Sequence, residues 1–115
     1  MPVLSIATNL KRDQIPEDFI REASKFVASE LKKPESYVLV QVLTDQIMSF
    51  GGTTEPCANI TLGSIGVVSE DKNGKMAPKL CEFIQKKLGI KQNRFYINVN
   101  NIDPAWCIFD GNTFA

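Results

Sequence analysis

The most reactive group that the sequence offers is the amine of Pro2. A proline directly after the initiator favours removal of Met1, so we expect a mature chain that begins with a secondary amine on a rigid ring. Val3, Leu4 and Ile6 follow in the pattern of a strand that enters a core. Apolar surroundings disfavour a charged amine, so the pKa of Pro2 should fall below the ordinary α-amino value of about 7.7–8.0. Pro2 is therefore a candidate general base.

Other common chemistries find no support in the sequence. Histidine is absent from all 115 residues, which removes Ser-His-Asp and Cys-His catalysis. Cys57, Cys81 and Cys107 are widely spaced, so they predict neither a zinc site nor a disulfide framework, and they fit a reduced, cytoplasmic compartment. No glycine-rich phosphate loop occurs. We expect no metal and no cofactor.

Composition predicts one folded domain over residues 1–115. The 13 basic and 13 acidic residues cancel, so no global field favours nucleic acid or an anionic membrane surface. No apolar run is long enough for membrane insertion, and no secretion signal is recognisable at the start of the chain.

Two parts of the chain show the same order of strand, helix and strand. In the first half, a strand at 3–7 precedes apolar residues at helical spacing over 19–31, and a nearly continuous apolar run at 37–43 predicts a strand covered on both faces. In the second half, a strand at 58–66 precedes helical spacing over 76–88. Arg94 to Val99 is the last strand of this half.

These halves predict an α/β (α+β) fold made of two pseudo-symmetric β-α-β repeats. Their four strands should form one sheet with both helices on one face. In the second helix, Pro78 is tolerable only in the first turn, and Gly89 stands where a left-handed cap belongs. We also expect a short edge strand at 47–50, and a tail strand at 106–109 before a turn at Asp110-Gly111.

Two helices on one side cannot cover both faces of this sheet. Partner subunits would cover the remainder, so we expect a homo-oligomer. The strand residues for which we expect such cover are Val40, Val42, Ile60, Leu62, Ile97 and Val99.

Over its full length the chain resembles the tautomerase superfamily, and closely the macrophage migration inhibitory factor family. It is less similar to the sister family of D-dopachrome tautomerases. The residues that carry the resemblance are Met1-Pro2, Thr8-Asn9, Lys33 to Val38, Asp45-Gln46, Phe50 to Gly52, Glu55 to Ala58, Ser64 to Gly66, Lys79-Leu80, Arg94 to Asn98 and Thr113 to Ala115.

The resemblance implies a homotrimer with three active sites at subunit interfaces and an isomerase activity on phenylpyruvates and dopachrome. Pro2 would be the general base, and Lys33 with the Ile65 backbone would hold the substrate carboxylate. Tyr96 and Asn98 of a neighbouring subunit would line the aromatic end of the pocket. Phe114 would close its wall. To remove a proton from a carbon beside a carbonyl group, a site needs such a base, a cation that holds the substrate carboxylate and apolar walls that exclude water.

Two departures from the family pattern affect the expected activities. The thiol oxidoreductase motif reads Cys57-Ala58-Asn59-Ile60, so the second thiol is missing and we expect no such activity. Cys57 and Cys81 then read as small buried apolar residues. At the pocket rim Phe109 stands where the family has Trp, while Trp106 and Cys107 are also unusual. We expect activity on phenylpyruvates to survive with altered Michaelis constants.

The resemblance also implies a second class of function, a cytokine-like signalling ligand. Arg12 and Asp45 occupy the positions of a charged pair that binds chemokine receptors, and the family also binds the invariant-chain receptor. Such a protein would be cytoplasmic and also secreted by a non-classical route. The alternative to an active enzyme is a receptor ligand with a vestigial tautomerase pocket.

Overall fold

The computed structural model describes residues 1–115 and is built on a single four-stranded sheet. Its strands are β1 (Val3–Thr8), β2 (Leu39–Leu43), β3 (Ala58–Ser64) and β4 (Phe95–Asn101), in the spatial order β2-β1-β3-β4. β1 pairs in parallel with β2, β3 pairs in parallel with β4, and β1 and β3 are antiparallel at the centre. The two predicted β-α-β repeats are confirmed.

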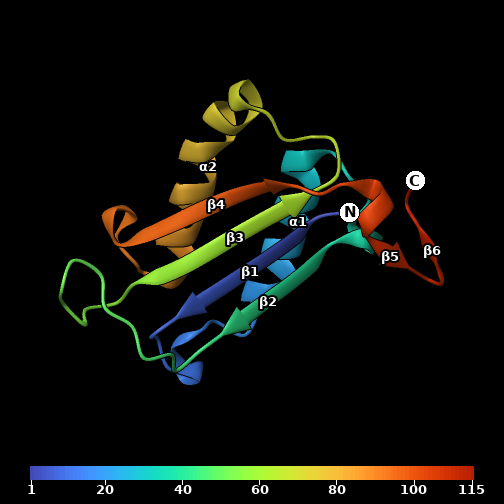
Figure 1. The fold of residues 1–115 in the computed structure, drawn as a ribbon. Helices are drawn as coiled ribbons and strands as arrows, with labels where there is room; N and C mark the ends of the chain where they lie inside the picture. Colours follow the sequence, from blue (N-terminus) through green and yellow to red (C-terminus); the bar gives the residue numbers. More distant parts are fainter.

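Both helices, α1 (Phe19–Leu31) and α2 (Glu70–Leu88), lie on the same side of the sheet (Figure 1). A hairpin of β5 (Ile108–Phe109) and β6 (Asn112–Thr113) follows β4, and Figure 1 places it at the end of the sheet where the N-terminus lies. Neither helix is long and apolar enough to cross a membrane. Short 3-10 helices span Arg12–Gln14, Glu35–Tyr37, Gln92–Arg94 and Pro104–Trp106.

The helix ends follow from local residue chemistry. Ser69 caps α2 because its hydroxyl accepts a hydrogen bond from the backbone N–H of Lys72 at 3.2 Å. Gly89 ends α2 in the left-handed conformation with φ 71°, as the sequence predicts. α1 ends in the same conformation at Lys32, a residue without glycine's freedom, with φ 53°.

Pro78 lies inside α2 rather than in its first turn, so that prediction is wrong. The cap at Ser69 starts the helix earlier than the apolar spacing indicates. A proline here cannot donate to the carbonyl one turn back, at Gly74. Burial of the apolar stripe offsets this loss. The stripe consists of Met76, Leu80, Ile84 and Leu88.

The core lies between the sheet and the two helices. The prediction of which strand residues need cover from partner subunits is wrong in its choice of face. Ile60 and Leu62 are buried in the core, and Val40, Val42, Ile97 and Val99 pack against it. The run at 37–43 is apolar at almost every position, so its sequence does not show which residues point to the helices.

The opposite face of the sheet has no cover within the chain. β2 was expected to be covered on both faces, yet Leu39 is 55% and Leu43 is 42% exposed. Tyr96 on β4 is 68% exposed. A partner subunit is therefore still expected to cover this face of the sheet, which is formed by the strand residues that alternate with those facing the helices.

Two smaller elements also differ from the prediction. Residues 47–50 form no strand, because Phe50 makes only an isolated bridge to Thr53 around a two-glycine turn. The tail strand is short, since Trp106 belongs to a 3-10 helix. The turn at Asp110-Gly111 is confirmed, with φ of 51° and 84°, the positive pair of a tight hairpin.

Arg94 fastens the 50–56 loop to the start of β4. Its guanidinium donates to the carbonyl oxygens of Phe50 (3.2 Å), Thr53 (3.3 Å), Glu55 (3.0 Å) and Pro56 (3.0 Å). The cation also lies 5.6 Å from the centre of the Phe50 ring. This many bonds from one side chain needs the planar fork of arginine.

Substituting Arg94→Met should destabilise the protein by about 2 kcal/mol, because four carbonyl groups lose a charged donor. Urea unfolding would measure the loss, with Lys91→Met as a control on a nearby exposed cation. Equal stability of the two variants would contradict this role for Arg94.

Candidate functional site

Pro2 is fully buried at the start of β1. Its carbonyl oxygen accepts a hydrogen bond from the backbone N–H of Leu39 at 3.0 Å, which joins it to the start of β2. On the other side, β1 pairs with β3 from Val3 opposite Gly63, so the same register places Pro2 opposite Ser64. The residue is therefore held by both neighbouring strands.

The surroundings of the N-terminus favour a neutral amine. Burial, followed by the positive charge of Lys33, lowers the pKa of the Met1 amino group below its ordinary value, and Cys107 opposes the shift. Met1 is only part-buried, whereas Pro2 is fully buried. Removal of Met1 would move the amine one residue further into the protein, where desolvation of the charged form is greater.

Ile65 lies at the same end of the sheet, directly after β3. Two contacts with the end of β4 hold this turn: Ile102 N–H donates to the Ser64 carbonyl at 2.8 Å, and Gly66 N–H donates to Asn101 Oδ1 at 3.2 Å. Gly66 has φ 75°, a conformation that glycine adopts without strain. The structure thus brings Pro2, Lys33 and Ile65 to one end of the sheet.

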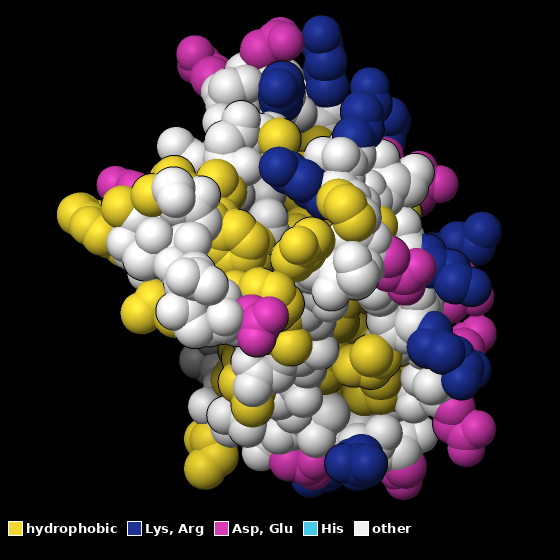
Figure 2. Space-filling model, turned by 90° about the vertical axis from the view of Figure 1, so that its right-hand side faces the viewer, with side chains coloured by type: hydrophobic (Ala, Val, Ile, Leu, Met, Phe, Trp, Pro, Cys, Tyr) yellow, Lys and Arg dark blue, Asp and Glu magenta, His cyan; other side chains and the backbone are white.

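Three aromatic rings form a cluster beside this end. The Tyr37 ring lies 5.4 Å from that of Phe109 and 6.0 Å from that of Phe114, and the last two rings stack at 5.9 Å. Figure 2 views the molecule from this side and shows apolar side chains gathered around hollows, with charged side chains mostly at the margin. Phe114 and Phe109 were expected at the wall and rim of the pocket, whereas Tyr37 was expected only as the start of a strand.

Cys107 and Trp106, two rim residues that depart from the family pattern, differ from each other in their contacts. Cys107 Sγ is 3.1 Å from Met1 Sδ, so the tail of the chain closes over the N-terminus. Trp106 is 85% exposed and belongs to no aromatic pair. Of the two, only Cys107 contacts the candidate site within one chain.

Tyr96 and Asn98 do not join this cluster. β4 pairs them with Asn59 and Thr61 of β3, five and three positions from Ser64, or roughly 17 and 10 Å at the rise of a strand. The Tyr96 ring lies 5.1 Å from that of Phe50. Both residues line a mainly apolar groove of about 420 Å³ between α2 and β4.

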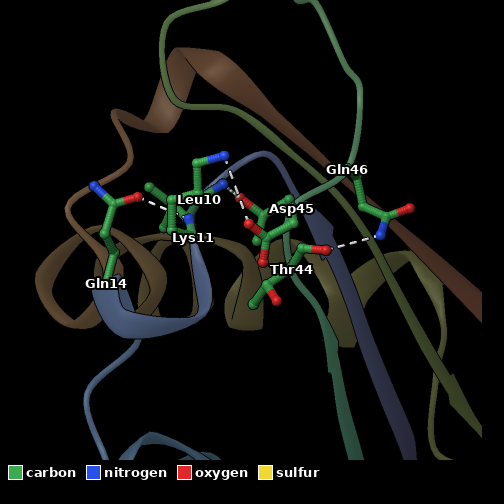
Figure 3. A network of polar contacts seen from close by, with 7 residues as sticks. Leu10, Lys11, Gln14, Thr44, Asp45 and Gln46 are labelled. Atoms are coloured by element: carbon green, nitrogen blue, oxygen red, sulfur yellow. Dashed lines mark hydrogen bonds and ion pairs between the residues drawn. The ribbon is translucent and has the colours of Figure 1, made fainter.

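Arg12 and Asp45 lie at the opposite end of β1 and β2, where both line a groove of about 940 Å³. They do not pair with each other. The Asp45 carboxylate instead forms an ion pair with Lys11, with 3.6 Å between the carboxylate oxygen and Lys11 Nζ (Figure 3). Asp45 has φ 60°, and its N–H donates to the Leu10 carbonyl at 2.8 Å. The six residues of β1, roughly 20 Å, separate this groove from Pro2.

Comparison with known proteins places this geometry in a family. The family model described as macrophage migration inhibitory factor matches residues 1–115. The chain belongs to the macrophage migration inhibitory factor family. It is 44% identical to the homolog from Trichinella spiralis over 99% of this chain and 100% of that one, and 36% identical to the Xenopus tropicalis factor over 100% of both.

Solved structures of the family share the fold. The factor from Trichinella spiralis matches with a TM-score of 0.95 and 40% identity, covering 97% of this chain and 99% of that chain. The factor from Toxoplasma gondii matches with a TM-score of 0.84 and 32% identity, covering 97% and 99%. The four-stranded sheet with two helices is therefore the family's fold.

The cysteines differ in their surroundings. Cys57 is buried as predicted, and its backbone bonds to Thr8 Oγ1 at 2.8 Å and to Asn9 Oδ1 at 3.0 Å. Cys81 is only part-buried and lines the groove between α2 and β4, so its prediction as a buried residue is only partly confirmed. All three cysteines are free, and no three His, Cys, Asp or Glu side chains are grouped to hold a metal ion.

Proposed function

We propose that this member of the macrophage migration inhibitory factor family is a cofactor-independent isomerase that tautomerises small aromatic keto acids of the phenylpyruvate type and dopachrome. The observation that carries the proposal is the burial of Pro2 beside Lys33, in surroundings that lower the pKa of the terminal amine. A buried neutral amine is a base near neutral pH.

The proposed reaction is a proton transfer between carbon and oxygen. The free amine of Pro2 takes the proton from the carbon between the ring and the carbonyl group, which leaves an enolate and a protonated amine. The enolate oxygen then takes a proton from water to give the enol, and the amine returns its proton to the solvent. In the reverse direction the protonated amine returns its proton to that carbon. The ammonium group of Lys33 and the backbone at Ile65 hold the substrate carboxylate.

The substrate ring would lie against the aromatic cluster of Tyr37, Phe109 and Phe114. These rings exclude water, which keeps the amine neutral and strengthens the ion pair with the carboxylate. The T-shaped contacts of Tyr37 with the other two rings hold the wall in place.

A homotrimer would complete the site. Tyr96 and Asn98 lie too far from Pro2 to act in the same chain, so a neighbouring subunit has to supply them. The exposed apolar residues on the open face of the sheet, among them Leu39 and Leu43, support such an assembly.

We further propose that the protein is a cytokine-like ligand, found in the cytoplasm and released by a non-classical route. The supporting observation is that Arg12 and Asp45 line one groove at the end of the sheet away from Pro2. The invariant-chain and chemokine receptors are the proposed partners. Because the two sites are separate, receptor binding can persist with a vestigial tautomerase pocket.

Insertion of one alanine between Met1 and Pro2 should abolish phenylpyruvate tautomerisation, because it converts the Pro2 amine into an amide without a free lone pair. The assay compares this variant with the parent, after mass spectrometry confirms loss of Met1 from both. An active insertion variant would disprove the role of Pro2.

Substituting Lys33→Gln should raise the pKa of Pro2, since a positive neighbour that disfavours the protonated amine is lost. The acidic limb of the profile of kcat/KM against pH then moves to higher pH, so the loss is greater at about pH 6 than at about pH 8. KM should also rise. Lys32→Gln is the matched control, and an identical profile in both variants would refute the effect.

The double substitution Arg12→Gln and Asp45→Asn should weaken receptor binding at least about tenfold and leave tautomerisation unchanged. Asparagine suits position 45 because it tolerates the positive φ there. The affinity of each variant for immobilised receptor would be measured, and Asp71→Asn on α2 would be the control variant. Equal loss of both activities would show that the two functions are not separable.

A further inference from the structure

The hydroxyl of Ser64 is a buried polar group without a partner. Ser64 is 0% exposed at the end of β3, and its Oγ makes no hydrogen bond. The other buried hydroxyl of the sheet, on Thr8, donates to the Cys57 carbonyl at 2.8 Å and accepts from Leu10 N–H at 3.2 Å. An unpaired buried hydroxyl costs free energy, so Ser64 calls for an explanation.

The sheet places Ser64 beside Pro2. The antiparallel register of β1 and β3 pairs Val3 with Gly63 and Leu4 with Leu62, so Pro2 and Ser64 are the next directly opposed residues. They lie on the same face as the core residues Leu4 and Leu62. Directly opposed residues have Cβ atoms about 4.5–5.5 Å apart, so the Ser64 side chain is a direct neighbour of the Pro2 ring.

The chemical state of the Pro2 nitrogen decides whether it can donate a hydrogen bond to Ser64. With Met1 attached, this nitrogen is a tertiary amide, which has no hydrogen to donate. Once Met1 is removed, the neutral secondary amine carries one N–H and one lone pair. The protonated amine carries two N–H bonds.

We propose that Ser64 is a positioning residue for Pro2: its Oγ accepts a hydrogen bond from the N–H of the free Pro2 amine, and this bond directs the nitrogen lone pair toward the substrate. The inference rests on the proposed tautomerase function. When Pro2 takes a proton from substrate carbon, the new N–H forms on the lone pair, and the bond to Ser64 is kept throughout. Ser64 therefore exchanges no proton.

The first test is a thermal cycle that needs no substrate. Ser64→Ala should lower the Tm of the mature chain by roughly 3 °C, because the amine loses its acceptor. In the chain with alanine inserted before Pro2, the same substitution should leave the Tm unchanged or raise it, since no N–H is there to be lost.

Thr8→Val is the matched control, because it removes a partnered hydroxyl from the far end of β1. It should lower the Tm equally with and without the insertion. An equal effect of Ser64→Ala in both chains would show that Ser64 does not bond to the amine and would overturn the inference.

The second test is the pH profile of tautomerisation. Hydrogen bonding to an acceptor favours the protonated amine, so Ser64→Ala should move the acidic limb of kcat/KM to lower pH. It should also lower kcat about tenfold with little change in KM, because the lone pair is no longer aimed. Ser64→Thr, which keeps the hydroxyl, should restore kcat. An unchanged limb and kcat in Ser64→Ala would contradict positioning.

The two tests separate this inference from the proposed function. If Ser64→Ala lowers the Tm only in the chain without the insertion and the parent chain is inactive, the bond between Ser64 and the amine stands and the tautomerase function is refuted. If the parent chain is active and Ser64→Ala has the same effect on the Tm of both chains, the tautomerase function stands and the bond is refuted.

Discussion

The arrangement depends first on the antiparallel pairing of β1 with β3 at the centre of the sheet. β1 is the first strand of one β-α-β half and β3 is the first strand of the other. Because they are antiparallel, the start of β1 lies opposite the end of β3. Pro2 is thereby brought against Ser64 and Ile65. The parallel partner β2 starts beside β1 as well, which brings the connection from α1, with Lys33 and Tyr37, to the same end. These two pairings thus bring together residues from three separate segments.

Burial of a chain terminus is costly when the terminus is charged, and this cost is the basis of the proposed chemistry. Burial and then the positive charge of Lys33 lower the pKa of the Met1 amino group, and the proposed chemistry requires the same effect on the amine of Pro2 once Met1 is removed. A neutral secondary amine in a dry, aromatic site can accept a proton from carbon without a metal or a cofactor. The groups at the other end of the sheet, around Asp45 and Lys11, remain exposed and solvated, so they perturb this balance little.

The sequence predicted most of the fold and only part of the site. Helical spacing, Gly89 and the Asp110-Gly111 turn are local signals, and each was confirmed. The covered face of the sheet was assigned wrongly, because the apolar run at 37–43 has no alternation to read. Pro78 was misplaced because a single cap at Ser69 extends the helix N-terminally.

Residues that act through distant contacts had no signal in the sequence. Tyr37 read as a strand residue, and its role in the aromatic cluster follows only from its packing on Phe109 and Phe114. Arg94 gave no indication of the four carbonyl groups that it holds across some forty residues of chain. Ser64 was part of the motif by which the family was recognised, but its unpaired hydroxyl is visible only in the folded chain.

The pKa of the Pro2 amine tests the central claim most directly. The measurement is a titration of the mature protein, labelled with nitrogen-15 at proline and followed by NMR, with loss of Met1 verified by mass. The account predicts a pKa well below the ordinary range of an α-amino group, about 7.7–8.0, so that the amine is mostly neutral at physiological pH. A pKa within or above that range would contradict the claim that burial and Lys33 make Pro2 a base.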